Sequence, residues 1–142
     1  MGTRSLTVFN DSWNDEEIAV FYRQFDGYPA GHGRELLTLL QDMNIVNGMN
    51  SDNMKLKIAN GMDCLAAQVV ADFKEGPGDF YLHKAGTRDV GEEYIYTLYT
   101  KNNKLQIKVE DTYEDEDTGK KGHELFNSSI EDYRKWINEE WT

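Results

Sequence analysis

The sequence predicts a single α+β domain over residues 1–142, in which a mostly antiparallel sheet is covered by about three helices. Short alternating apolar runs and longer runs with helical spacing are segregated along the chain, which is typical of this class. A length of 142 residues is usual for one domain and allows a buried core without disulfides or metal. The hydrophobic fraction of 39%, with three Trp, eight Tyr and six Phe, exceeds that of a disordered chain. We expect the element order ββααβββα.

Two strands are predicted near the N-terminus. Residues 5–9 form a short apolar run that ends in the turn-forming residues 10–12. Residues 17–25 form a second run, and residues 18–21 are too apolar for a strand exposed on both faces. The short connection between them favours a β-hairpin.

Two helices are expected next. The first runs from about Gly33 to the region of residues 44–48, because Leu36, Leu37, Leu40 and Met43 recur at helical spacing. The second helix ends at residues 76–78. Its apolar stripe consists of Ile58, Met62, Leu65, Ala66, Val69, Val70 and Phe73. Gly61 interrupts this stripe at a cost of about 1 kcal/mol relative to Ala, so it requires a packing reason.

The C-terminal part predicts further strands and one helix. Residues 80–83, 94–100 and 105–109 read as strands, and Asn102-Asn103 turns the last two into a hairpin. The sequence leaves open whether a fourth strand follows these three. The final helix is expected to begin at Ser128, which forms a capping box with Glu131. Its apolar residues are Ile130, Tyr133, Trp136, Ile137 and Trp141.

Charge and composition exclude some classes of function. A net charge of -11 argues against binding to nucleic-acid duplexes, which requires clustered Lys and Arg. The same charge allows a different role, that of an acidic interaction protein that blocks a basic partner.

We expect no membrane association and a cytoplasmic location, because the chain lacks a long apolar run. Cys64 is the only cysteine and is expected to be a buried packing residue. Formation of a homo-oligomer is left open.

No metal or cofactor is predicted. The three histidines are scattered along the chain, at positions 32, 83 and 123. Residues 110–117 contain six carboxylates, but they lack the ligand spacing of an EF-hand. We interpret this acidic run as a solvated extension of a hairpin.

Four sequence blocks carry a resemblance to a protein family. They are GTRSL at residues 2–6, YRQFDGYPxGHG at 22–33, ANGMxCLAAQ at 59–68 and GTRDxGEEY at 86–94. Together they resemble a family of small hypothetical proteins of bacteria and tailed phages. The resemblance implies a stand-alone, cytosolic and phage-borne protein. It supplies no catalytic assignment.

The segment from Tyr22 to Glu35 is the candidate site. It concentrates Arg, His and Gly residues where a strand is expected to pass into a helix. Backbone N–H groups at such a helix start attract phosphate, and guanidinium groups bind phosphate oxygens in a bidentate fork. Tyr28 could stack on a base. The residues predicted to bind the ligand are Arg4, Arg23, Gln24, Asp26, Tyr28, His32, Arg34 and Arg88.

These residues favour a binding protein for a small phosphorylated ligand, most of all a nucleotide or a nucleotide-derived signal. A phage protein of this kind could sequester a host defence messenger. The first alternative is a phosphodiesterase or nucleotide hydrolase that uses His32 as a base. The second is the acidic interaction protein described above. A purely structural interpretation also exists, in which Arg23 pairs with Asp26 and the glycines only allow a tight entry into the helix.

Overall fold

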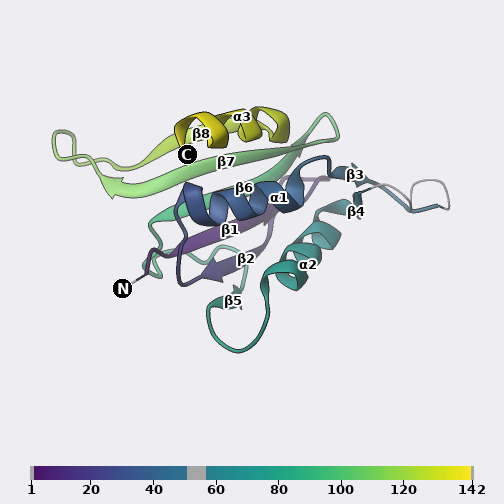
Figure 1. Cartoon of the computed structure of the whole chain (residues 1–142), viewed down its shortest axis with the longest axis horizontal. Coiled ribbons are helices and arrows are strands. Elements are labelled where there is room, and N and C mark those ends of the chain that lie inside the picture. The colour runs from purple at the N-terminus through teal and green to yellow at the C-terminus, as the bar shows by residue number, and fades with distance from the viewer. Residues whose placement is uncertain (1, 51–56, 142) are drawn as a thin grey trace.

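A six-stranded sheet forms the frame of the molecule, and three helices pack on one of its faces (Figure 1). The computed structural model describes residues 2–50 and 57–141. In chain order, the elements are β1 (Ser5–Asn10), β2 (Glu17–Arg23), the π-helical turn η1 (Pro29–Gly33), α1 (Arg34–Leu40), β3 (Asn44–Val46), β4 (Ile58–Asn60), α2 (Gly61–Phe73), β5 (Phe80–His83), β6 (Tyr94–Lys101), β7 (Lys104–Glu114), β8 (Lys121–Ser129) and α3 (Ile130–Glu140). The predicted α+β class and the mostly antiparallel sheet are confirmed.

The strands follow the spatial order β5-β2-β1-β6-β7-β8. The predicted hairpins β1–β2 and β6–β7 both form, and β8 extends the sheet beyond β7 as a further antiparallel strand. One pairing is parallel, because β6 lies beside β1 with Phe9 opposite Leu98. The chain reaches β6 from β5 by crossing over two intervening strands, which a sequence of hairpins alone does not predict.

Strand alternation separates two apolar clusters. The larger cluster lies on the helix-covered face, where Phe9, Phe21 and Tyr96 are buried together with residues of all three helices. The smaller cluster lies on the opposite face and contains Leu6, Val8 and Val20. It is covered in part by Val90, which belongs to the connection between β5 and β6. The sheet is therefore apolar on both faces around β1 and β2.

The region around α2 corrects two predicted boundaries. Ile58 belongs to β4, which pairs in parallel with β3, and α2 begins only at Gly61. Gly61 has φ of +84°, which an interior helical residue does not adopt, so it is a helix start and not an interruption. The first helix ends at Leu40, whereas the sequence extended it to residues 44–48. The predicted inward stripe is otherwise confirmed, since Leu65, Val69 and Phe73 are buried.

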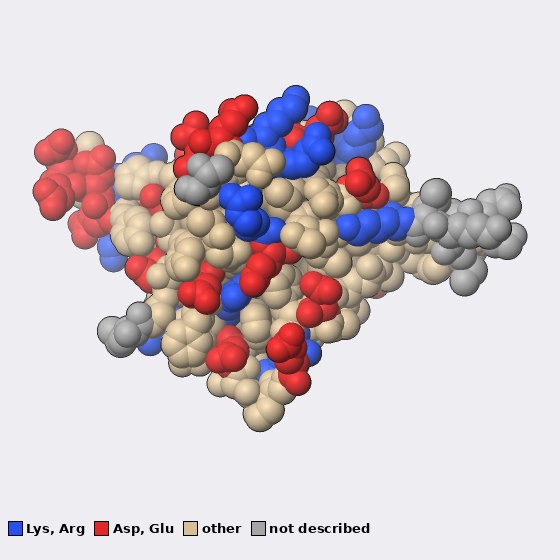
Figure 2. All heavy atoms as spheres, viewed as in Figure 1, with Lys and Arg blue, Asp and Glu red and all other residues tan. Residues whose placement is uncertain are grey.

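The C-terminal hairpin and helix also depart slightly from expectation. The N-cap of α3 is Ser129, whose hydroxyl accepts a hydrogen bond from Asp132 N, and not Ser128. Ser128 instead donates to the carboxylate of Asp132. The acidic run extends the β7–β8 hairpin, as expected, and Figure 2 shows carboxylates gathered at its tip on the left. Over the rest of that face, cationic and acidic side chains are interspersed.

Two smaller expectations concern the membrane and the thiol. Among the helices of the described residues, none combines the length and apolar character needed to cross a bilayer. Cys64 is half-buried at the edge of the main core, and its Sγ accepts a 3.4 Å hydrogen bond from Gln68 Nε2. It therefore packs on the core without being fully enclosed.

Candidate functional site

The predicted residues Arg23 and His32 meet in a buried hydrogen-bonded network. Arg23 ends β2 on the helix-facing side of the sheet, and its Nη1 lies 3.2 Å from His32 Nδ1. The same guanidinium forms an ion pair with Glu35 in the first turn of α1. The side chain of Arg23 is 10% exposed, whereas that of Glu35 is 53% exposed. Only the carboxylate end of this network therefore reaches solvent.

The protonation state of His32 follows from its partners. A guanidinium can only donate, so His32 Nδ1 accepts from Arg23. The ring proton is then on Nε2, which donates to Thr7 Oγ1 at 2.7 Å. Complete burial, together with the charge of Arg23, lowers the pKa of His32 from 6.5 to about 3. His32 is thus a neutral histidine that connects β1 to β2 and η1.

Aromatic rings enclose the same network. The guanidinium carbon of Arg23 lies 5.1 Å from the ring centre of Phe80 and 6.0 Å from that of Phe73. The imidazole of His32 packs against Phe73 and Tyr96, with centroid separations of 5.2 and 5.0 Å. These contacts exclude water, which strengthens the hydrogen bonds and explains why the imidazole stays uncharged.

The backbone between β2 and α1 is held in place by the rest of the fold. Tyr96 Oη donates to Gly27 O at 2.7 Å, and Tyr133 Oη donates to Gly33 O at 2.8 Å. Burial raises the pKa of both tyrosines, so both remain protonated donors. A Cβ at Gly27 would lie 2.7 Å from Ser5 Cβ, so this position requires glycine for close approach.

The backbone N–H groups before α1 are already used. Gly31 N donates to Tyr28 O at 2.9 Å, His32 N donates to Asp26 O at 2.8 Å, and Gly33 N points to Tyr28 O at 3.4 Å. The sequence-based expectation of free donors for phosphate at this helix start therefore does not match the geometry. The π-turn geometry of η1 satisfies them internally.

Three predicted arginines are placed elsewhere. Arg34 Nη2 donates to the carbonyl oxygens of Trp141 at 2.7 Å and Ile137 at 3.3 Å, so it caps the C-terminus of α3. Arg88 forms an ion pair with Glu17 at 2.7 Å. The guanidinium of Arg4 packs on Gly91, where a Cβ would clash with it.

The remaining predicted residues lie at the surface of the turn. Asp26 and Tyr28 are exposed, and Tyr28 Oη donates to Asp26 Oδ1 at 3.3 Å. The backbone N of Gln24 donates to Asp79 O at 2.8 Å. Arg23 pairs with Glu35 and not with Asp26, which differs from the structural interpretation of the sequence. The structure thus brings together Arg23 and His32, and separately Asp26 and Tyr28, but not the eight residues as one site.

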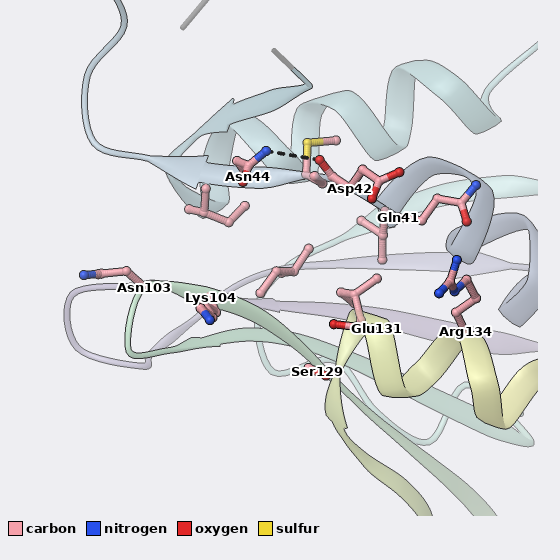
Figure 3. Close-up of a pocket in the computed structure, with 13 residues that line it drawn as sticks. Gln41, Asp42, Asn44, Asn103, Lys104, Ser129, Glu131 and Arg134 are labelled. Atoms are coloured by element: carbon pink, nitrogen blue, oxygen red, sulfur yellow. Dashed lines mark hydrogen bonds between the residues drawn. The ribbon is translucent and has the colours of Figure 1, made fainter.

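A cleft lies at the other end of α1, between α1, the β6–β7 turn and the start of α3 (Figure 3). Its volume is about 550 Å³, within the range of small-molecule sites. Its lining residues are Leu40, Gln41, Asp42, Met43, Asn44, Ile45, Asn103, Lys104, Leu105, Ser129, Ile130, Glu131 and Arg134. In Figure 3, Arg134 points from α3 toward the side of the cleft formed by Gln41 and Asp42.

The cleft combines four kinds of group. The side-chain nitrogens of Lys104 and Arg134 form no hydrogen bond or ion pair with residues 2–50 and 57–141. Two carboxylates, Asp42 and Glu131, also face it, and Met43 contributes to its apolar part. The amide side chains of Gln41 and Asn103 supply both donors and acceptors, whereas Asn44 offers only its amide oxygen because its Nδ2 already donates to Asp42 O and Lys57 O. A ligand that carries an anionic group, a flat apolar part and polar edges matches this set.

The sequence analysis missed this cleft because its residues come from three distant segments, 40–45, 103–105 and 129–134. In the sequence these three segments share only one feature, which is that each contains polar turn residues where a helix or strand ends. A second open cavity, of about 520 Å³, includes the predicted residue Arg88. Four carboxylates line it, which makes it a poorer match to an anionic ligand. They are Asp89, Glu92, Glu110 and Asp111.

Two further findings bear on the site. Within the described residues, no group of three or more His, Cys, Asp or Glu side chains is arranged to hold a metal ion. Comparison of the chain with protein-family models, with curated proteins and with solved structures finds no match. The resemblance to small phage and bacterial proteins stays a prediction.

Proposed function

We propose that this protein binds a small phosphorylated ligand, a nucleotide or a nucleotide-derived signal, in the cleft between α1, the β6–β7 turn and α3. The observation that supports the proposal most is the pair of cations, Lys104 and Arg134, which line the cleft without partners among the described residues. Cations with no internal partner are available to a ligand anion. The guanidinium groups of Arg23 and Arg34 are not available in this way, because Glu35 engages the first and the end of α3 engages the second.

The other lining groups suit the remainder of a nucleotide. Arg134 presents a planar fork that matches two phosphate oxygens, and Lys104 offers a second positive charge on the opposite side of the cleft in Figure 3. Apolar contact with Met43 and Ile45 suits the face of a base, and nearby amides can pair with its edge. A carboxylate such as Glu131 can accept hydrogen bonds from ribose hydroxyls, as acidic residues do in dinucleotide sites.

The geometry favours binding over turnover. A hydrolase that used His32 would require its imidazole to reach a substrate, but the ring is fully buried and both nitrogens are engaged. The hydroxyl of Ser129 in the cleft caps α3, and among the described residues no histidine lines the cleft beside it. Binding without turnover is the property that sequestration of a signalling nucleotide requires, so we keep that role as part of the proposal.

Calorimetry tests the proposal with mononucleotides, cyclic dinucleotides and ADP-ribose derivatives. Arg134→Gln should weaken the binding of the tightest ligand by about 1.5–3 kcal/mol, the usual contribution of one charged hydrogen bond. Lys135→Gln is the matched control, because it removes a neighbouring charge on α3 that does not line the cleft. Chromatography of the recovered ligand should show it unchanged. Equal affinity in wild type, Arg134→Gln and Lys104→Gln would contradict the proposed location.

A further inference from the structure

The turn between β1 and β2 presents the most exposed large hydrophobic side chain among the described residues. Trp13 is 91% exposed, although tryptophan is usually buried over most of its large surface. A single exposed hydrophobic residue is common and carries no inference by itself. The turn around Trp13, however, is closely hydrogen-bonded.

Four hydrogen bonds fix the turn. Asp11 N donates to Glu16 O at 2.8 Å, and Asp15 N donates to Asp11 O at 3.0 Å. Trp13 N donates to Asp11 Oδ1 at 2.9 Å, and Glu16 N donates to Asn14 Oδ1 at 3.0 Å. The backbone therefore holds the indole outward, away from the body of the protein. Such preorganisation lowers the entropic cost of docking the ring elsewhere.

The Trp13 turn and the α1–α3 cleft lie at the same end of the sheet. β1 and β6 run parallel, with Phe9 opposite Leu98, so both strands end toward the same side. The β6–β7 turn that follows Lys101 supplies Asn103 and Lys104 to the cleft. Both features therefore project toward the right-hand end of the molecule in Figure 1. A two-fold axis at that end can bring each turn to the cleft of a second copy.

We infer that two copies of this chain form a symmetric dimer in which Trp13 of each copy occupies the α1–α3 cleft of the other. Met43 and Ile45 are half-buried and offer the indole an apolar surface, and Arg134 can lie over its face as a cation–π partner.

The turn carries acidic side chains that complement the two cations of the cleft. Carboxylates such as Asp11 and Asp15 can approach Lys104 and Arg134, which have no partner among the described residues, although Asp42 and Glu131 also line the cleft and make it neutral as a whole. Glu131 also faces the cleft, and its carboxylate can accept a hydrogen bond from the indole N–H. An interface of this type is isologous, so both contacts form together and the assembly closes at two.

Sedimentation velocity across the micromolar range tests the dimer, at about 0.15 M salt so that the net charge of -11 is screened. The wild type should dimerise. Trp13→Ala and Arg134→Glu should each raise the dimer Kd by well over about thirtyfold, because thirtyfold is the effect of losing one interface hot spot and a symmetric variant dimer loses the contact in both copies. Leu82→Ala is the matched control, because Leu82 is 66% exposed on β5, at an outer strand of the sheet.

A mixing experiment distinguishes reciprocal insertion from general adhesion of the indole. Trp13→Ala keeps an intact cleft and Arg134→Glu keeps an intact tryptophan, so an equal mixture should regain one of the two contacts and form heterodimers. A monomeric wild type, an unchanged Kd in Trp13→Ala, open-ended polymers, or a mixture that stays monomeric would each overturn the inference. Circular dichroism confirms that each variant is folded.

Formation of the dimer requires the residues of the cleft but does not require a bound nucleotide. If the proposed function also holds, the ligand and Trp13 compete, and saturating nucleotide should dissociate the dimer. This regulatory step rests on the proposed function. A dimer that forms as described but ignores every nucleotide would support the interface and count against ligand binding in the cleft.

Discussion

His32 should make the stability of the protein depend on pH. Its pKa falls from 6.5 to about 3 because the ring is fully buried and because Arg23 is positively charged. Below pH 6.5 the unfolded chain therefore binds one more proton at this residue than the folded protein does, and the folding equilibrium constant falls about tenfold per pH unit until about pH 3. Above pH 6.5 both states are neutral, and this contribution to the pH dependence disappears. Between pH 6.5 and about 4.5 the loss is about 2 kcal/mol.

Urea unfolding of wild type and His32→Gln over a series of pH values measures this effect. The Gln amide can donate to Thr7 and accept from Arg23 without titrating. Subtracting the two curves removes the contributions of all carboxylates and of the other histidines, which the proteins share. The wild type should lose stability relative to the variant as pH falls below 6.5. Parallel curves would refute the reasoning, because they would mean that His32 gains its proton equally in both states.

Two further predictions concern packing and capping. Leu65→Ala should destabilise the protein by about 2–5 kcal/mol, because Leu65 is 0% exposed; an unchanged urea midpoint would show that α2 does not pack on the sheet as described. Arg34→Met should cost about 1–3 kcal/mol, because it leaves the carbonyl oxygens of Ile137 and Trp141 without this donor. Arg134→Met is the control, because Arg134 lies on α3 facing the cleft, and it should leave the urea midpoint nearly unchanged. Equal losses of stability in both variants would argue against capping by Arg34.

Local patterns predicted much of the fold because the relevant contacts are close in sequence. The hairpins and the buried face of α2 follow from alternation and from helical spacing. The parallel pairing of Phe9 with Leu98 joins segments that are far apart, and no local pattern encodes it. Ile58 has the spacing of the α2 stripe but pairs with Asn44 in a strand, so tertiary pairing overrides periodicity there.

The candidate site was predictable only in part for the same reason. Clustering in the sequence correctly joined Arg23 with His32, although as a buried network. It also included Arg34, because it could not anticipate that the end of α3 lies within reach of that guanidinium. Lys104 and Arg134 carry no local motif, and they share a cleft only because the β6–β7 turn and the start of α3 meet near α1.

The location of the ligand is tested most directly by NMR of the backbone amides during titration with adenosine and guanosine monophosphates. The proposed function predicts saturable shifts at residues 41–45, 103–105 and 129–134, and no shifts above the general level at residues 26–35. In Arg134→Gln, the same shifts should require roughly tenfold to a hundredfold more ligand. Shifts confined to residues 26–35, or no saturable shifts with any phosphorylated compound that binds in calorimetry, would contradict a ligand site in the α1–α3 cleft.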